Sequence, residues 1–324
     1  MCTAIRFKAR GIYYGRTLDL EYSLGEGVVM TPCRRALSFR HSKCMREHYA
    51  MLGIGIVADG YPLYYDAMNE RGLWIAGLNF PQYAKYNSGR RGMLNLASYE
   101  LIPFVLSRCA TVTEAEVILE SANITSEPFS ENFPPTPMHW MICDREHCAV
   151  IEQTEHGLAI HESDIGVLTN SPPYDMQTEN LSRYLSLTPN PPVSRFSDET
   201  TLSPCSRGMG AYGLPGDVSS TSRFVRAAFT LANASIPEGE DDSVGQLYHI
   251  LGSVEQVSGT VRLEGGSLER TVYTSCADPQ RMTYYYTTYE NSTPTAVKLD
   301  PSALVESSPT FYPFDRRMRI THQN

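Results

Sequence analysis

The chain has 324 residues, of which 42% are hydrophobic and 19% are charged, a composition typical of a globular protein with one large domain or two ordinary ones. The net charge of −9 and the pI near 5.4 argue against a nucleic-acid or anionic-membrane partner, because phosphate binding requires a basic face. No apolar run reaches the ~18 residues of a membrane span, and the amino terminus does not resemble a signal peptide. We therefore expect a cytoplasmic protein.

Short apolar or alternating runs, broken by turn residues, predict strands in the amino-terminal quarter of the chain. They are Thr3 to Phe7, Ile12 to Arg16, Val28 to Thr31, Met51 to Val57 and Leu73 to Leu78. The period then lengthens, which predicts one helix after Ser98 and a second that begins at a capping box of Thr113 and Glu116.

Strands and helices alternate in blocks along the rest of the chain. The predicted elements are a hairpin of Met138 to Cys143 and Cys148 to Glu152, helices at Tyr174 to Leu187, Ser222 to Ala234 and Ser243 to Val257, and strands at Met282 to Tyr289 and Thr295 to Leu299. Because the blocks do not form β-α units and no linker separates them, we expect a single α+β domain.

The eight cysteines form no dense framework, so in a reducing compartment we expect free thiols and no disulfide. His139, Cys143, His147 and Cys148 are residue types that bind zinc. On a hairpin, however, His139 and Cys143 share a face while Cys148 and His147 point oppositely, so we expect no metal site. The segment Gly208 to Gly213 matches a dinucleotide fingerprint by letter, but no strand precedes it. We expect instead a glycine-rich loop that closely approaches other backbone.

Cysteine is the second residue, so removal of the initiator methionine would leave a thiol and an α-amine on one residue. The reference pKa is ~8.5 for a thiol and ~7.7–8.0 for an α-amine, so near neutral pH the amine can take the proton of the sulfur. Terminal residues are often frayed and without function, which is the alternative for Cys2. No Gly-x-Ser-x-Gly or His-Glu-x-x-His motif offers another nucleophile, so Cys2 is the candidate.

Polar residues at strand ends are candidates to support this nucleophile. Arg16 and Asp19 form either a surface ion pair or, if they face the terminus, a pair in which Arg16 favours the thiolate and Asp19 holds the α-ammonium or Arg16. Asn79 and Asn170 each lie at the exit of a strand and before a proline, where turn chemistry is one explanation. The other is that an amide side chain and a backbone N–H converge on a tetrahedral oxyanion.

Seven segments together resemble the choloylglycine hydrolase family, which contains bile salt hydrolases and penicillin V acylases. They are Met1 to Ile5, Gly15 to Asp19, Met68 to Leu73, Gly77 to Pro81, Gly166 to Pro172, Gly213 to Asp217 and Ser222 to Arg226. The resemblance implies the four-layer αββα amino-terminal-nucleophile fold, with two stacked antiparallel sheets covered by helices on both sides. It also implies one domain over residues 2–324 with Met1 removed, usually assembled as a homotetramer.

The resemblance also assigns roles to individual residues. It makes Cys2 the nucleophile, Arg16 and Asp19 the pair beside it, Asn170 the side chain of the oxyanion hole, Asn79 the backbone N–H that completes the hole, and Arg223 the supporting arginine. It places an apolar substrate pocket on Leu18, Ala58, Tyr65, Phe129 and Phe133. No metal or organic cofactor is implied.

The expected reaction is hydrolysis of the amide bond of glycine- and taurine-conjugated bile acids through a Cys2 thioester. Asn79 favours bile salts, because penicillin V acylases of Gram-positive type tend to carry Tyr at that position. Thr17 favours the alternative, a penicillin V acylase or another N-acyl amidase, because many bile salt hydrolases have Asn there. A non-catalytic sterol or bile-acid carrier, in which Cys2 is incidental, is the alternative from another class.

Overall fold

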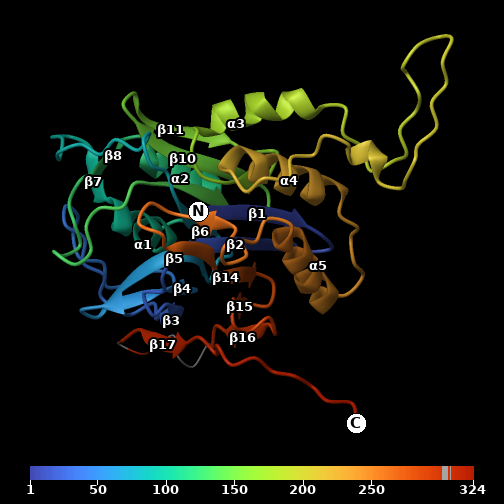
Figure 1. Ribbon diagram of the computed structural model, residues 1–324. Coiled ribbons are helices and arrows are strands. Elements are labelled where there is room, and N and C mark those ends of the chain that lie inside the picture. Colours follow the sequence, from blue (N-terminus) through green and yellow to red (C-terminus); the bar gives the residue numbers. More distant parts are fainter. Residues whose placement is uncertain (301–305, 307) are drawn as a thin grey trace.

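The computed structural model describes residues 1–300, 306 and 308–324 and contains two large antiparallel sheets (Figure 1). The strands of the first sheet follow the order β12-β1-β2-β14-β15-β16, with β13 paired to β14. Their bounds are β1 Cys2–Lys8, β2 Ile12–Leu20, β12 Val167–Leu168, β13 Val261–Arg262, β14 Leu268–Asp278, β15 Thr283–Thr288 and β16 Thr295–Lys298. The amino terminus thus begins an inner strand.

The second sheet has eight strands in the order β11-β10-β9-β6-β5-β4-β3-β17. Their bounds are β3 Gly27–Thr31, β4 Met51–Ala58, β5 Tyr61–Asn69, β6 Trp74–Asn79, β9 Met138–Cys143, β10 Cys148–Thr154, β11 Gly157–Glu162 and β17 Thr310–Pro313. A separate parallel pair joins β7 Leu94–Ala97 to β8 Ala122–Thr125.

Helices cover the outer face of each sheet, which completes the four-layer αββα arrangement expected from the sequence (Figure 1). On the first sheet lie α4 Ser220–Asn233 and α5 Glu240–Gly252, with α3 Tyr174–Leu181 packed on α4. On the second sheet lies α1 Leu101–Leu106, followed in the chain by α2 Val112–Leu119. Short 3-10 turns are η1 Ser98–Glu100, η2 Ser182–Tyr184 and η3 Met209–Ala211.

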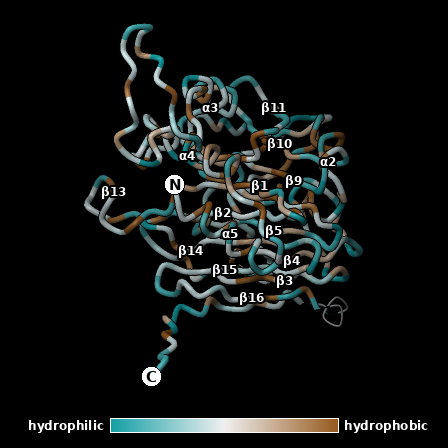
Figure 2. Tube along the Cα trace, turned by 90° about the vertical axis from the view of Figure 1, so that its right-hand side faces the viewer, coloured by the Kyte–Doolittle hydropathy of each residue, from teal (hydrophilic) through white to brown (hydrophobic). Residues whose placement is uncertain are grey.

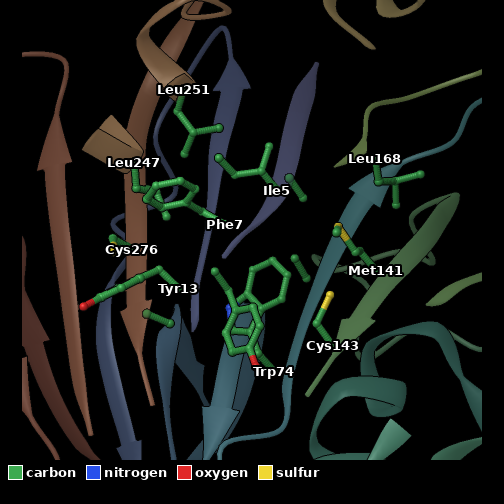
Figure 3. Packing of buried hydrophobic residues seen from close by; sticks show 14 of the residues in the cluster. Ile5, Phe7, Tyr13, Trp74, Met141, Cys143, Leu168, Leu247, Leu251 and Cys276 are labelled. Atoms are coloured by element: carbon green, nitrogen blue, oxygen red, sulfur yellow. The ribbon is translucent and has the colours of Figure 1, made fainter. Parts of the chain in front are cut away.

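The two faces of β1 and β2 pack against different layers, because successive side chains on a strand point to opposite sides. Figure 3 shows Ile5 beside Leu247 and Leu251 of α5, with Trp74 of the second sheet on the other side. On that side, Tyr14 stacks on Trp74 with ring centroids 5.3 Å apart. Residues 2, 4, 14, 16 and 18 therefore face the space between the sheets.

The predicted strands and the Met138–Glu152 hairpin are confirmed, but three helices were predicted with wrong boundaries. The helix predicted from Ser243 to Val257 is α5, which begins at Glu240 and ends at Gly252. The cap of α2 lies two residues earlier than the predicted one: the side chain of Thr111 accepts from the N–H of Glu114 at 3.2 Å. The helix predicted to reach residue 187 ends as α3 at Leu181 and continues only as the η2 turn. Strands β5, β7, β8, β11, β13, β14 and β17 were not predicted.

The expectation that all cysteines are free is wrong for one pair. Cys143 and Cys148 are direct cross-strand partners in β9 and β10, with Cα atoms 4.1 Å apart, and the structure joins them in a disulfide. A hairpin places directly opposite residues on the same face, so these two side chains meet. Counting cysteines and considering their spacing did not reveal this contact.

The segment Gly208 to Gly213 is a loop that approaches other backbone closely, as predicted. A Cβ atom on Gly210 would lie 2.0 Å from the backbone oxygen of Asn190, so only glycine fits there. The chain between η2 and η3, yellow in Figure 1, projects from the body and does so in the perpendicular view as well (Figure 2). Within the described residues, no helix is long and apolar enough to span a membrane.

Candidate active site

Cys2 is the first residue of β1, and its side chain is 3% exposed between the two sheets. Its backbone pairs with Leu18 of β2. The sulfur accepts a hydrogen bond from Nη2 of Arg16 at 2.8 Å. This contact places the positive charge of the guanidinium directly beside the sulfur. The arginine therefore faces the terminal residue and does not form a surface ion pair.

Arg16 is held in place by backbone carbonyl groups of both sheets. Its Nη1 donates to the oxygens of Gly77 at 2.9 Å and Tyr65 at 3.3 Å, and its Nε donates to Thr17 at 3.2 Å. Burial by itself lowers the pKa of the Arg16 guanidinium, but the Cys2 sulfur and other nearby acidic groups raise that pKa above its ordinary value. Arg16 is thus a fixed positive charge beside the thiol.

Arg223 reaches the same residue from α4 and is fully buried. Its Nη1 donates to the backbone oxygen of Cys2 at 2.5 Å and to Oγ1 of Thr3 at 2.7 Å, and its Nη2 donates to Oδ1 of Asn170 at 2.7 Å. Burial lowers the pKa of Arg223, although the neighbouring Asp19 and Cys2 oppose that change. Arg223 fixes the backbone of Cys2 and the side chain of Asn170 relative to each other.

Asn170 lies just beyond β12 and joins the two strand exits singled out in the sequence. Its Oδ1 also accepts from the backbone nitrogen of Cys2 at 2.8 Å, and its Nδ2 donates to the backbone oxygen of Asn79 at 2.7 Å. Because both partners of Oδ1 are donors, the amide can have only this orientation. Nδ2 carries two hydrogens, of which Asn79 accepts one. The expected residues of the oxyanion hole therefore lie together, next to the nucleophile.

Asp19 is fully buried near the start of the chain, but its carboxylate contacts neither Arg16 nor an α-ammonium by a hydrogen bond. It accepts from Oγ1 of Thr271 at 2.6 Å and Oγ1 of Thr17 at 3.4 Å. The α-amine of Met1 donates to the backbone oxygen of Asp19 at 2.6 Å. Burial raises the pKa of Asp19, while the terminal amine and Arg223 oppose the rise.

The five predicted pocket residues form two groups. Leu18 pairs with Cys2, and the backbone oxygen of Tyr65 accepts from Arg16, so these two lie beside the nucleophile. Ala58, the last residue of β4, pairs instead with Tyr61 of β5. Phe129 and Phe133 join Ala58 in the second group, which gathers around Tyr61. Ring centroids of Phe129 lie 5.8 Å from Tyr61, 5.3 Å from Tyr99 and 6.2 Å from Phe133.

Sequence reasoning missed a buried carboxylate between the sheets. Asp66 accepts hydrogen bonds from the hydroxyls of Tyr273 at 2.6 Å, Ser275 at 2.9 Å and Tyr284 at 2.5 Å. Burial raises the pKa of Asp66, and the charge of Arg16 opposes the rise. An aspartate inside an apolar strand is the sequence signal that could have identified this network, because buried charges require partners.

Two further observations concern metal binding and a cavity. Among the described residues, no group of three or more His, Cys, Asp or Glu side chains could hold a metal ion. A cavity of about 500 Å³ opens between the end of β1, α3 and α4, lined in part by Phe7, Leu181 and Phe229. None of the predicted site residues lines this cavity, so it is not the expected substrate pocket.

Two stacked antiparallel sheets between helical layers, with a buried cysteine at the start of an inner strand, define an enzyme of the amino-terminal-nucleophile fold that acts on amide bonds. The model of the linear amide C–N hydrolases, choloylglycine hydrolase family, matches residues 2–312. The chain belongs to this family.

Similar proteins share most of the chain. A bile salt hydrolase/transferase of Lactiplantibacillus plantarum is 44% identical over 313 residues, 97% of each chain. A mutant conjugated bile acid hydrolase from Clostridium perfringens has a crystal structure that matches with a TM-score of 0.92 at 34% identity over the full length of both chains. A penicillin V acylase from Agrobacterium tumefaciens matches with a TM-score of 0.76 over 95% of this chain and 90% of its own, but at 18% identity it shares the fold alone.

Proposed function

We propose that the protein hydrolyses the amide bond of glycine- and taurine-conjugated bile acids, with Cys2 as its nucleophile. The observation that carries this proposal is the 2.8 Å contact between the Arg16 guanidinium and the Cys2 sulfur. Full-length similarity to proteins named bile salt hydrolase and conjugated bile acid hydrolase supports the substrate class.

The mechanism begins with removal of Met1, which frees the amine of Cys2. The thiolate of Cys2 attacks the side-chain carbonyl of the substrate and forms a carbon–sulfur bond. Nδ2 of Asn170 and the backbone N–H of Asn79 stabilise the resulting oxyanion. The α-ammonium protonates the leaving nitrogen as the carbon–nitrogen bond breaks, and a thioester remains. Water, deprotonated by the same amine, then hydrolyses the thioester, so no metal or cofactor is needed.

The structure supports this assignment of the acid and base. The backbone nitrogen of Cys2 already lies 2.8 Å from Oδ1 of Asn170. When Met1 is removed, that nitrogen becomes the α-amine and keeps an acceptor that orients it. Asp19 would then provide negative charge near the new ammonium, and Arg223 would hold the backbone oxygen of Cys2.

Apolar contact is the proposed basis of substrate recognition. Leu18 and Tyr65 flank the nucleophile, and Ala58, Phe129 and Phe133 gather with Tyr61 farther along. A rigid steroid that touches both groups buries a large apolar area. Because the protein and the conjugated bile salt are both negatively charged, long-range attraction does not drive binding.

The second candidate function is a penicillin V acylase, for which Thr17 was the sequence indication. In the structure, Oγ1 of Thr17 accepts from the backbone of Thr3 at 3.2 Å and donates to Asp19. Alternation along β2 turns this side chain away from the face that carries Arg16 and Leu18. Thr17 therefore lies outside the face that carries Arg16 and Leu18, next to the proposed nucleophile.

The test is to measure release of the amine from glycocholate, taurocholate and penicillin V in one assay. We expect both bile salts to be cleaved much faster than penicillin V. Comparable or faster cleavage of penicillin V would reverse the order of the two candidates. No cleavage of any of the three would overturn the proposal.

We also propose that the protein is a single domain over residues 2–324, that it assembles as a homotetramer and that it acts in the cytoplasm. Exposed apolar side chains on and near the projecting segment, Leu185, Val193 and Phe196, support self-association. Light scattering tests the assembly, and cell fractionation tests the location.

A further inference from the structure

Two buried residues of the second sheet, His139 in β9 and Glu152 in β10, have no part in the mechanism described above. Both residues are shielded from solvent, at 0% and 1% exposure. Nδ1 of His139 lies 2.8 Å from Oε1 of Glu152, and its Nε2 lies 2.9 Å from the backbone oxygen of Thr169. Thr169 directly precedes Asn170, so this imidazole supports the residue on which the proposed oxyanion hole depends.

The hydrogen-bond partners of the pair are each other and backbone groups. Both ring nitrogens of His139 face oxygen atoms, and the backbone oxygen of Thr169 can only accept. The backbone N–H of Tyr174 also donates to both carboxylate oxygens of Glu152, at 3.1 and 3.2 Å.

The same imidazole also contacts the other strand exit. The ring of Phe80 stacks on His139 with centroids 4.2 Å apart and an angle of 7° between the planes. Phe80 follows Asn79, whose backbone oxygen accepts from Asn170. His139 thus touches one neighbour of each residue in the proposed oxyanion hole. Glu152 extends this support to the start of α3 through Tyr174.

We propose that His139 and Glu152 are a positioning pair for the oxyanion hole, holding the exits of β6 and β12 at the distance that catalysis requires. The inference rests on the proposed function. The hydrogen bonds of His139 go to Glu152 and Thr169 and not to Cys2, so the pair acts through the backbone of Thr169 and Asn170. Its loss should lower kcat and leave KM nearly unchanged, because the binding residues lie elsewhere.

Three variants test the pair. Glu152→Gln keeps a hydrogen bond to His139 and one of the two bonds from Tyr174, because its amide nitrogen can donate to the imidazole and its amide oxygen can accept. We expect its kcat on taurocholate to stay close to that of the native enzyme. Glu152→Leu and His139→Leu remove the support, and we expect kcat to fall by about 10–100-fold, since displacement by ~1 Å can cost about 10²-fold.

His48→Leu is the matched control for loss of a histidine. Its ring nitrogens also lie against two backbone oxygens, of Tyr49 at 2.7 Å and Arg35 at 2.6 Å, but in a segment that holds no proposed site residue. We expect a lower unfolding temperature and an unchanged kcat. An equal fall in kcat for His48→Leu would attribute the effect to lost stability and overturn the inference.

Hydrogen–deuterium exchange of the peptide covering residues 167–174 gives a readout that needs no substrate. Exchange should be faster in Glu152→Leu than in the native protein and unchanged in Glu152→Gln. If Glu152→Leu matches the native protein in both kcat and exchange, or if Glu152→Gln is as impaired as Glu152→Leu, the pair does not position the loop. By contrast, a native enzyme that cleaves no bile salt refutes the proposed function while the exchange result still tests the pair.

Discussion

The substitution Asn170→Asp separates the catalytic role of Asn170 from its structural role. Asp has the same shape and keeps the oxygen that accepts from Cys2 and Arg223. It replaces the donor Nδ2 with an oxygen that faces the backbone oxygen of Asn79. The variant therefore removes a hydrogen-bond donor from the proposed oxyanion hole while it keeps the contacts to Cys2 and Arg223.

The expected magnitudes follow from these contacts. Loss of one oxyanion donor lowers kcat by about 10²–10³, or about 2.7–4 kcal/mol. The new carboxylate oxygen cannot donate to the backbone oxygen of Asn79, and the lost hydrogen bond costs about 1–3 kcal/mol of folding stability. The charge-assisted hydrogen bond between the new carboxylate and Arg223 contributes about 1.5–3 kcal/mol in the opposite direction. Asn170→Asp should thus unfold at nearly the native denaturant concentration while turning over very slowly.

The assay is kcat and KM for taurocholate, with the unfolding free energy measured by urea denaturation of the same samples. Asn170→Ala is the comparison, because it also removes the acceptor of Arg223 and should lose stability as well as activity. A kcat for Asn170→Asp within about threefold of native would refute the reasoning, since one donor is worth about 10² or more. A raised KM with unchanged kcat would make Asn170 a binding residue.

Three further predictions concern the terminus, the pocket and a helix cap. Mass spectrometry should show that the purified protein lacks its initiator methionine. Cys2→Ser should keep the fold but lose nearly all hydrolysis, because a hydroxyl is a far weaker nucleophile near neutral pH. Substantial turnover by the serine variant would contradict the mechanism. Phe129→Ala combined with Phe133→Ala should raise KM for bile salts by an amount equivalent to ~1–3 kcal/mol, with an unchanged KM excluding both rings from the pocket. The pKa of Asp217 is lowered to about 2 by hydrogen bonds from Ser219 and Ser222 at the start of α4. The ionised Asp217 therefore stabilises the folded protein above the unfolded pKa of ~3.9, and this stabilisation is lost as pH falls toward 2. In urea denaturation, Asp217→Ala should lower the free energy of unfolding by about 1 kcal/mol at pH 7, after allowance for the exposure of the side chain, and by almost nothing at pH 2.

Local pattern was enough to predict much of the fold. The runs that became β1, β2 and β4 and the β9–β10 hairpin have clear apolar periodicity, and turn residues mark their ends. Strand β14 was missed because both of its faces are buried while many of its residues are polar: Thr271 bonds to Asp19, and Ser275 to Asp66. Hydroxyl groups that find buried partners remove the apolar signal on which a strand prediction depends.

Local sequence pattern predicted less of the candidate site than of the fold. Cys2 could be proposed from its position, but its partner Arg223 lies 221 residues away and Asn170 lies 168 residues away. No periodicity relates such residues. Asn170 could be considered from its place at the exit of a strand, whereas only the resemblance to a family indicated Arg223. His139 was considered as a possible zinc ligand and Glu152 only as the end of a strand. Neither interpretation predicted that the two side chains would form a hydrogen bond across the hairpin.

The position of β14 has a consequence for how the enzyme matures. Strand β2 directly follows its neighbour β1 in the chain, but its other neighbour, β14, ends at Asp278. The amine of Met1 is held in the finished structure by Asp19 and by Glu269, which belongs to β14. While a ribosome adds residues at ~5–20 per second, the terminus stays outside this enclosure for many seconds. A methionine aminopeptidase acting on the nascent chain would therefore meet an open amino terminus, before β14 is in place beside β2.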